Sequence, residues 1–200
     1  MIQSEKDFRF YLEADRIALG IKKKKPSFVS DEIWQFERLL RKAEYYNNCR
    51  NHFPWKLYLL YLKVKLHYFG IYLGYTISMN TFGPGLSIAH IGTIVVNGNV
   101  KIGKNCRIHT CVNIGTQGGK RQTGEPEKVP FIGDNVYIGP GVKIFGDISL
   151  ADNIAIGANA VVNKSFTEPG ITIAGVPAFK ISDTGSHELI INATELVKKK

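Results

Sequence analysis

The sequence is poor in cysteine and has no long apolar run at its start. Its three cysteines, Cys49, Cys106 and Cys111, are an odd number without the spacing of metal ligands, which indicates a reducing, cytoplasmic compartment. The opening residues, Met-Ile-Gln-Ser-Glu-Lys-Asp, contain no apolar signal core, so we do not expect secretion.

Acidic residues are also scarce, at 17 against 26 lysines and arginines, which gives a formal net charge of +9 over 200 residues. Seven of the positive charges lie in two short runs, 22–25 and 198–200, and such runs are typical of solvated segments. Between Ser78 and Ile181 there is no basic face with interleaved aromatics, so we expect no nucleic-acid partner. An anionic partner, either a phosphorylated cofactor or a membrane surface, stays open.

The sequence does contain a repeat with a period of six. One set of aliphatic residues recurs at this spacing, and smaller apolar residues stand four places after its members. The first set is Ile132, Ile138, Ile144, Leu150, Ile156 and Val162, and the second is Val136, Val142, Ile148, Ile154 and Ala160. A period of six fits a chain that turns a corner every six residues and stacks its aliphatics inside a triangular prism. The repeat therefore predicts a hexapeptide parallel β-helix. The same frame runs upstream to Phe82 and slips by two residues before Val96.

Two other patterns flank the repeat. Residues 1–73 show helical spacing and predict an N-terminal α-helical domain, ahead of the β-helix at 74–181. The segment Trp55 to Tyr75 carries three lysines and a histidine, which argues against a membrane span. It fits either a helix over the open end of the β-helix or a helix that rests on a lipid surface. Residues 182–200 are a polar tail, with a short helix expected at 187–197.

Between Ile114 and Ile132 the repeat is interrupted by a polar, glycine-rich segment. We expect residues 116–129 to project from the prism as a loop, and such excursions usually mark the binding face of a repeat fold. The loop is expected to form a lid over the acceptor.

Two of the five histidines, His90 and His109, belong to the repeat. His90 stands near the slip of the frame, where a widened corner would turn a side chain outward. The two are nineteen residues apart without a close third histidine, so no metal site is expected.

Three motifs in this order resemble a known family. Residues 83–178 look like the serine acetyltransferase group of hexapeptide acyltransferases, including its relatives in capsule and exopolysaccharide gene clusters. The matching motifs are Ile88-Ala-His-Ile-Gly-Thr-Ile-Val-Val96, Asn113-Ile-Gly-Thr-Gln-Gly-Gly119 and Ala174-Gly-Val-Pro-Ala178. The resemblance implies a left-handed β-helix and direct transfer of acetyl from acetyl-CoA to a hydroxyl, with His90 as general base.

The resemblance also implies roles for other residues. His109, Tyr75 and Asn113 are candidates to assist His90, and a backbone N–H at Gly115 or Thr116 would hold the oxyanion. The coenzyme would lie in a groove between prisms of a homotrimer. Its expected contacts are Gly115, Thr116, Gly139, Pro140, Gly157, Ala158, Lys164 and Lys180.

This sequence departs from the family at the acceptor site. Where serine acetyltransferases have two aspartates and an Arg-His pair, it has Ala89, Tyr75 and Lys128-Val129. These changes favour a sugar hydroxyl of a surface polysaccharide or its precursor over free serine, because they remove charged contacts to a zwitterion. They also leave open whether Tyr75, a backbone carbonyl, Glu13 or Asp15 orients His90. Serine O-acetylation and a non-catalytic scaffold are the alternatives. We expect a cytoplasmic enzyme, with contact to the inner face of a membrane left open.

Overall fold

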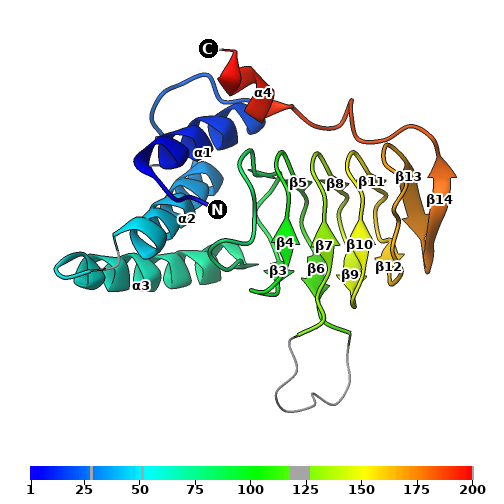
Figure 1. Cartoon of the computed structure of the whole chain (residues 1–200), viewed down its shortest axis with the longest axis horizontal. Coiled ribbons are helices and arrows are strands. Elements are labelled where there is room, and N and C mark those ends of the chain that lie inside the picture. Colours follow the sequence, from blue (N-terminus) through cyan, green and yellow to red (C-terminus); the bar gives the residue numbers. More distant parts are fainter. Residues whose placement is uncertain (28, 51, 118–126, 200) are drawn as a thin grey trace.

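The computed structural model of the protein describes residues 1–27, 29–50, 52–117 and 127–199. Short strands wind into a prism with three parallel sheets, and helices close one end of it (Figure 1). The parallel β-helix and the N-terminal helical region that the sequence predicts are both present.

Three sheets form the faces of the prism. The first holds β1 (Tyr75–Thr76), β3 (Ile94–Val96), β6 (Val112–Gly115), β9 (Lys143–Phe145) and β12 (Val161–Val162). The second holds β4 (Lys101–Ile102), β7 (Phe131–Ile132) and β10 (Ser149–Leu150). The third holds β2 (Ser87–Ile88), β5 (Arg107–Ile108), β8 (Tyr137–Ile138), β11 (Ala155–Ile156), β13 (Thr172–Gly175) and β14 (Ala178–Ser182). Strands β13 and β14 pair antiparallel.

The strand register follows the sequence period. Ile144 pairs with Val162, 18 positions later, as three turns of six residues require. Ile114 pairs with Ile144, 30 positions later, so this coil carries 12 extra residues. The extra residues fall in the predicted loop 116–129, of which 118–126 lie outside the described residues. At its base, the Glu127 carboxylate accepts hydrogen bonds from Asn97 Nδ2 (3.0 Å) and Asn99 Nδ2 (2.9 Å).

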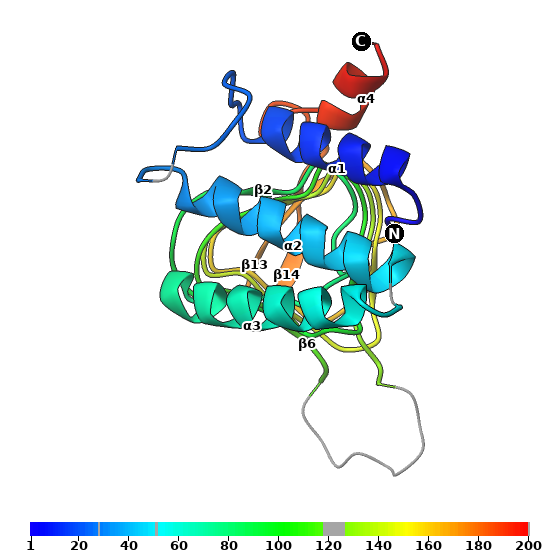
Figure 2. The same cartoon turned by 90° about the vertical axis from the view of Figure 1, so that its left-hand side faces the viewer.

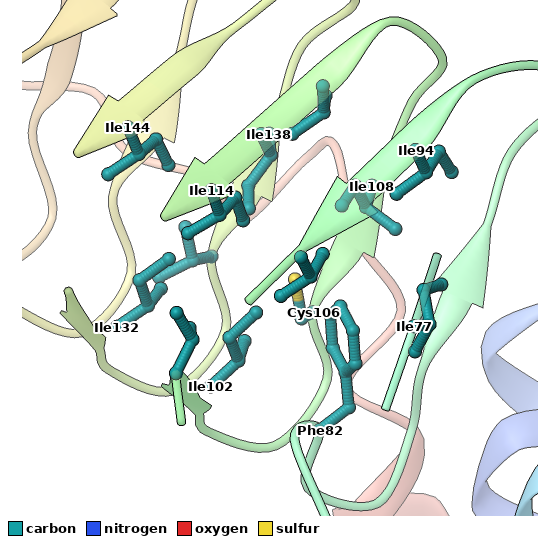
Figure 3. Packing of buried hydrophobic residues seen from close by; sticks show 14 of the residues in the cluster. Ile77, Phe82, Ile94, Ile102, Cys106, Ile108, Ile114, Ile132, Ile138 and Ile144 are labelled. Atoms are coloured by element: carbon teal, nitrogen blue, oxygen red, sulfur yellow. The ribbon is translucent and has the colours of Figure 1, made fainter. Parts of the chain in front are cut away.

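The interior of the prism is the predicted aliphatic stack. Each of the six main repeat positions from Ile132 to Val162 is at most 1% exposed. Figure 3 shows Ile102, Ile114 and Ile132 gathered in the same interior as Phe82 and Cys106. Burial of a side chain of this size stabilises the fold by roughly 1.5–3 kcal/mol, so the stack accounts for much of the stability of the prism.

Asparagines stack along one corner of the prism. Asn105 Nδ2 donates to Asn135 Oδ1 (2.8 Å), and Asn135 Nδ2 donates to Asn153 Oδ1 (3.0 Å). All three have φ between 55° and 61°, a left-handed conformation that asparagine tolerates better than most residues. This asparagine ladder therefore turns the chain and joins successive coils at the same positions.

Helices α1 (Glu5–Ala18), α2 (Glu32–Cys49) and α3 (Trp55–Leu73) form a layer across the first coil, which we call the helical cap (Figure 2). The helix α1 begins at Ser4, whose hydroxyl accepts a hydrogen bond from Asp7 N (3.1 Å). The helix α3 ends at Gly74, which has a φ of 81°. Among the described helices, none is long and apolar enough to cross a membrane.

Buried charges join the helical cap to the first coil. The Arg41 guanidinium is fully buried and binds Asp15 (2.7 Å) and Glu44 (3.0 Å). It also donates to the carbonyl oxygens of Phe82 (2.9 Å) and Gly83 (2.7 Å). These bonds satisfy backbone groups that have no preceding coil to pair with.

Acidic side chains of the helical cap accept hydrogen bonds from backbone N–H groups of the first coil. Asp15 accepts from Gly85 N (2.8 Å) and Leu86 N (2.9 Å), and Glu37 accepts from Ile88 N (3.0 Å). Side chains of α1 and α2 thus satisfy the backbone groups at this end of the prism. The helix α3, for which the sequence analysis considered a place over the open end, packs against α2 and against β1 of the first coil.

The tail returns from the far end of the prism to the cap. After β14 it runs back to α4 (Ala193–Lys198), which packs against α1 (Figure 1). Asn105 Nδ2 donates to Thr194 Oγ1 (2.9 Å), and Thr194 N donates to Asn105 Oδ1 (3.1 Å). The tail helix is six residues long, shorter than the segment 187–197 expected from the sequence.

Candidate active site

Half of the predicted site residues lie along one edge of the prism, where the chain passes from the third sheet to the first. Ile88, Ile108, Ile138 and Ile156 are in register on neighbouring strands, so the residues that follow them stack in successive coils. We call this line of turns the site edge; it consists of residues 89–93, 109–111, 139–142 and 157–160. It brings His90 and His109 together with Gly139, Pro140, Gly157 and Ala158.

The first turn of the site edge is wider than the others. Eight positions separate Ile88 from Val96, whereas six separate the equivalent residues Ile108 and Ile114. The two additional residues place His90 on the surface, where its side chain is exposed. The slip in the repeat therefore marks the turn that carries the candidate base, as the sequence analysis expected.

The wide turn is held by the junction between α3 and β1. Gly92 N donates to Leu73 O (3.1 Å), and Ile94 N donates to Gly74 O (3.0 Å). The Tyr75 hydroxyl donates to the carbonyl oxygen of His90 (2.9 Å). The helical cap thus fixes the backbone at His90 while leaving the imidazole free to meet a substrate.

The two histidines of the repeat face each other. Their ring centroids are 5.7 Å apart, and the His109 ring also packs edge-on against Tyr137 at 5.2 Å. Partial burial lowers the pKa of His109, and the positive charge of Arg107 and the neighbouring His90 lower it further. His109 is therefore uncharged at neutral pH.

The structure separates the candidates for orienting His90. Tyr75 binds the His90 backbone and not its ring. Asp15 is buried in the ion pair with Arg41, and Glu13 binds Arg16 at 2.7 Å. Within the described part of the chain, no carboxylate makes a hydrogen bond to the His90 imidazole. Of the aromatic groups, His109 lies against the ring.

A pocket of about 330 Å³ lies on the first sheet beside the site edge, between β6 and β9. Asn113, Gly115, Thr116 and Lys143 line it, so three predicted site residues share it. The sheet engages Gly115, which is in register with Phe145 and whose carbonyl accepts from Gly146 N (3.2 Å). Both residues expected to supply the oxyanion donor, Gly115 and Thr116, thus lie at this pocket.

Small residues on the site edge are required by the stacking of coils. A Cβ atom on Gly139 would lie 2.7 Å from the carbonyl oxygen of Ile156, and one on Gly157 would lie 2.9 Å from the Cβ of Ala174. Both distances are too short for a side chain. The neighbours Pro140 and Ala158 are exposed, so the outer surface of these turns is small and accessible.

The two predicted lysines lie away from the site edge. Lys164 follows β12 and stands over the Phe166 ring at 5.5 Å. Lys180 on β14 is paired with Glu168 and Asp183, each at 2.6 Å, so its charge is already matched. The structure gives neither lysine a place beside the histidines.

The positions that depart from the family pattern all lie in the described part of the chain. Ala89 lies on the wide turn, Lys128 is exposed, and Val129 packs against the core. Among the described residues, no three His, Cys, Asp or Glu side chains are arranged to hold a metal ion.

Sequence reasoning missed Arg107 and Tyr137. They are in register with Ser87 on the outer side of the third sheet, next to the histidine pair. Arg107 donates to Ser87 Oγ (2.8 Å) and is close enough to His109 to lower its pKa. Arg107 and Tyr137 are neighbours in space but 30 residues apart in sequence. The inserted loop lengthens the 18-residue coil between them, so the repeat did not reveal that they are neighbours.

Comparisons with known proteins agree with this geometry. The chain is 35% identical to a serine acetyltransferase of Staphylococcus aureus (strain Mu50 / ATCC 700699) over 103 residues, which are 52% of this chain and 46% of the relative. Over these residues the chain is similar to serine acetyltransferases. It spans about half the length of the curated relatives it matches, and no protein-family model matches it.

Solved structures give the same fold. A serine acetyltransferase of Neisseria gonorrhoeae is 25% identical with a TM-score of 0.65, and the match covers 90% of this chain and 68% of that one. A serine acetyltransferase solved in complex with CoA is 24% identical with a TM-score of 0.68, over 90% and 72% of the two chains. The hexapeptide acyltransferase fold is therefore shared over nearly the whole of this chain.

These comparisons correct one expectation. The sequence analysis favoured a polysaccharide sugar as acceptor and a closeness to enzymes of capsule and exopolysaccharide clusters. These relatives and structural neighbours are serine acetyltransferases, so that interpretation was wrong and serine becomes the better-supported acceptor. The absence of the family's charged residues was given too much weight, because it does not exclude other cations near the histidines.

Proposed function

We propose that the protein is an acetyl-CoA-dependent O-acetyltransferase whose acceptor is the hydroxyl of serine. The observation that carries the proposal is the wide turn that exposes His90 beside a second, neutral histidine, in a chain that is similar to serine acetyltransferases over about half its length. The neighbour solved in complex with CoA supports acetyl-CoA as the donor.

His90 acts as the general base. Its imidazole takes the hydroxyl proton as the serine oxygen attacks the thioester carbonyl, and it returns that proton to the departing sulfur of coenzyme A. Proton transfer by a well-placed side chain contributes about 10²–10⁴-fold. The Thr116 N–H stabilises the negative charge on the carbonyl oxygen, and His109 with Tyr137 keeps the His90 ring in place.

Arg107 binds the serine carboxylate. Arg107 is half-buried next to the histidine pair, and its guanidinium donates one hydrogen bond to Ser87 Oγ (2.8 Å). A planar guanidinium pairs with a carboxylate through two parallel hydrogen bonds, so Arg107 supplies a cation in place of the family's Arg-His pair. Asn113 faces solvent on the first sheet, across the site edge from Arg107, and offers a carbonyl to the ammonium group.

The donor lies along the site edge. The exposed surfaces at Pro140 and Ala158 admit the thin pantetheine chain, and the pocket lined by Asn113 and Thr116 receives its reactive end. We also infer a left-handed coil and a homotrimer in which a neighbouring prism completes the groove. A cytoplasmic location follows from the donor.

The test is release of free thiol from acetyl-CoA by the purified protein, with L-serine as acceptor. We expect turnover with serine, a loss of at least about 100-fold in His90→Ala, and a smaller loss in His109→Ala. Arg107→Gln is expected to raise KM for serine about tenfold or more with a smaller change in kcat. Thermal unfolding and the mass of the assembly serve as folding controls.

Two results would contradict the proposal. The first is turnover with other hydroxyl compounds but not with serine, which would reject the acceptor while keeping the chemistry. The second is a His90→Ala variant that keeps more than about a tenth of the activity while His109→Ala loses it, which would show that His90 is not the base.

A further inference from the structure

The helix α3 is apolar on two opposite sides. At roughly 100° per residue, Leu59, Leu62, Leu66 and Leu73 share the side that is buried against α2 and β1. A second apolar set lies on the opposite side and faces solvent, with exposed fractions from 48% to 72%. We call this set the outer face; it consists of Leu57, Leu60, Tyr61, Val64, Tyr68, Ile71 and Tyr72. Such a contiguous apolar patch is uncommon on a soluble protein and marks an interaction surface.

Positive charges border the outer face on both sides. By the same helical geometry, Lys56 and Lys63 lie along one border, with His67 beside them, and Lys65 lies along the other. All of these side chains are exposed, and α3 contains no aspartate or glutamate. The helix therefore presents an apolar strip between cationic margins.

The charges indicate what covers this strip. A second copy of α3 would bring lysines against lysines without a carboxylate on the helix to pair with them. On the adjacent helix α2, Glu37 and Glu44 are buried and engaged with the first coil and Arg41, and the third carboxylate, Glu32, lies in the first turn. An anionic surface matches the lysines, and an apolar layer beneath it matches the leucines and tyrosines.

We propose that the outer face of α3 binds the surface of an anionic lipid bilayer. The helix lies in the interface plane, with its leucines, valine and tyrosines among the upper acyl chains and its lysines at the level of the phosphates. Tyrosines are favoured at this depth because their rings are apolar and their hydroxyls stay hydrated. The buried side of the helix keeps its contacts with α2 and β1, so binding requires no unfolding. The proposal rests on α3 alone and does not depend on the acetyl acceptor.

Vesicle flotation of the full chain tests the proposal. Vesicles of phosphatidylcholine alone are compared with vesicles that also contain phosphatidylglycerol, at low and at high salt. We expect binding to the anionic vesicles at low salt and weaker binding at high salt, because exposed charges are screened. The triple variant Lys56→Gln, Lys63→Gln, Lys65→Gln is expected to lower the partition coefficient by about 100-fold, at about fivefold per lysine.

Two further variants separate the parts of the proposal. Lys22→Gln, Lys24→Gln, Lys25→Gln removes the same number of charges from a segment outside α3, and binding should stay within about threefold of the unaltered protein. Leu60→Ser, Val64→Ser, Tyr68→Ser keeps every charge and is expected to weaken binding at least about tenfold. Thermal unfolding confirms that each variant is folded.

Four outcomes would overturn the proposal. They are no binding of the unaltered protein to anionic vesicles, equal binding to neutral vesicles, equal losses in the two lysine variants, and full binding by the serine variant. If the α3 variants instead change the mass of the assembly in solution while no vesicle binding occurs, the outer face binds a second copy of the chain and the lipid proposal fails.

Discussion

The prism and the helical cap keep their interiors stable in different ways. The prism is filled by aliphatic residues at a fixed period, and each coil satisfies the backbone groups of the next. The cap contains a buried arginine and three buried carboxylates at the junction with the first coil. The difference shows that the end of a repeat fold needs residues of another kind, because its terminal strands have no neighbour.

The largest effect is expected from removing the Arg41 charge at the junction between the helical cap and the first coil. Arg41→Leu is expected to cost about 3–5 kcal/mol, because it leaves Asp15 and Glu44 buried without their partner. Urea unfolding measures the change. Arg38→Leu is the matched control, since Arg38 is half-buried and stands over the Trp34 ring without a carboxylate partner in the described structure. A cost below about 1 kcal/mol in Arg41→Leu would mean that the junction does not depend on the ion pair.

The prism should respond to loss of volume rather than loss of charge. Ile138→Ala is expected to cost about 2–5 kcal/mol, because the side chain is fully buried and its removal leaves a cavity. Phe131→Ala on the outer side of the second sheet should change the free energy of unfolding by less than about 1 kcal/mol. Hydrogen exchange should show the effect of Ile138→Ala in the middle coils, and that of Arg41→Leu in the first coil. Equal effects in both places would mean that the chain unfolds as one unit.

The asparagine ladder gives an intermediate effect. Asn135→Ala is expected to cost about 2 kcal/mol, because it removes two side-chain hydrogen bonds and puts alanine, which tolerates the left-handed conformation less well than asparagine, at a φ of 56°. Asn135→Gly loses the same hydrogen bonds, but glycine adopts a positive φ without strain. The difference in unfolding free energy between the two variants therefore measures the cost of the left-handed conformation. If both variants unfold at the same urea concentration, the left-handed turn contributes nothing measurable.

Of these substitutions, Glu37→Gln should change the free energy of unfolding least at pH 5. Its effect should be larger at higher pH. Burial raises the pKa of Glu37 well above its usual value, and the charge of Asp15 adds to this while Arg41 opposes it. The neutral form is therefore the one that the fold prefers. Its Oε2 atom has no hydrogen-bond partner among the described residues, so an amide there breaks no bond.

The sign of the pH dependence follows from linkage. In the unfolded chain the carboxyl ionises near pH 4.3, while in the folded protein it ionises at a higher pH. The stability that the acid contributes is full below about pH 4.3 and falls as the pH rises toward the folded pKa, by at most about 1.4 kcal/mol per pH unit. Between pH 5 and pH 8 the free energy of unfolding of Glu37→Gln, measured with urea, should therefore rise relative to that of the unaltered protein. A constant difference over this range would show that Glu37 titrates normally.

The sequence predicts the prism well because each interior residue repeats a local rule. Ile132 and Ile138 occupy equivalent places, so a period of six identifies both, and the slip near His90 identifies the widened turn. The junction could not be predicted in this way. Arg41 lies on a helix among other charged residues, and only the fold brings it to Phe82 and Asp15.

The candidate site was predicted in part for the same reason. His90 and the small residues of the site edge follow from the repeat and the motifs, and the structure places them in one line. Arg107 was missed because its neighbours in space are 20 and 30 residues away in sequence. The acceptor was misjudged because the sequence shows which side chains are missing at matching positions, but not which others approach from the adjacent coil.

The contact between α4 and α1 bears on how the protein folds. Within the prism most pairings join residues 18 or 30 positions apart, so coils can form one after another with a small entropic cost of loop closure. Asn105 meets Thr194 across 89 positions, and α1 meets α4 across nearly the whole chain. Contacts of such long range form slowly relative to local ones. We therefore expect folding in two kinetic phases, with a fast phase for the coils and a slower one in which the tail docks on the helical cap.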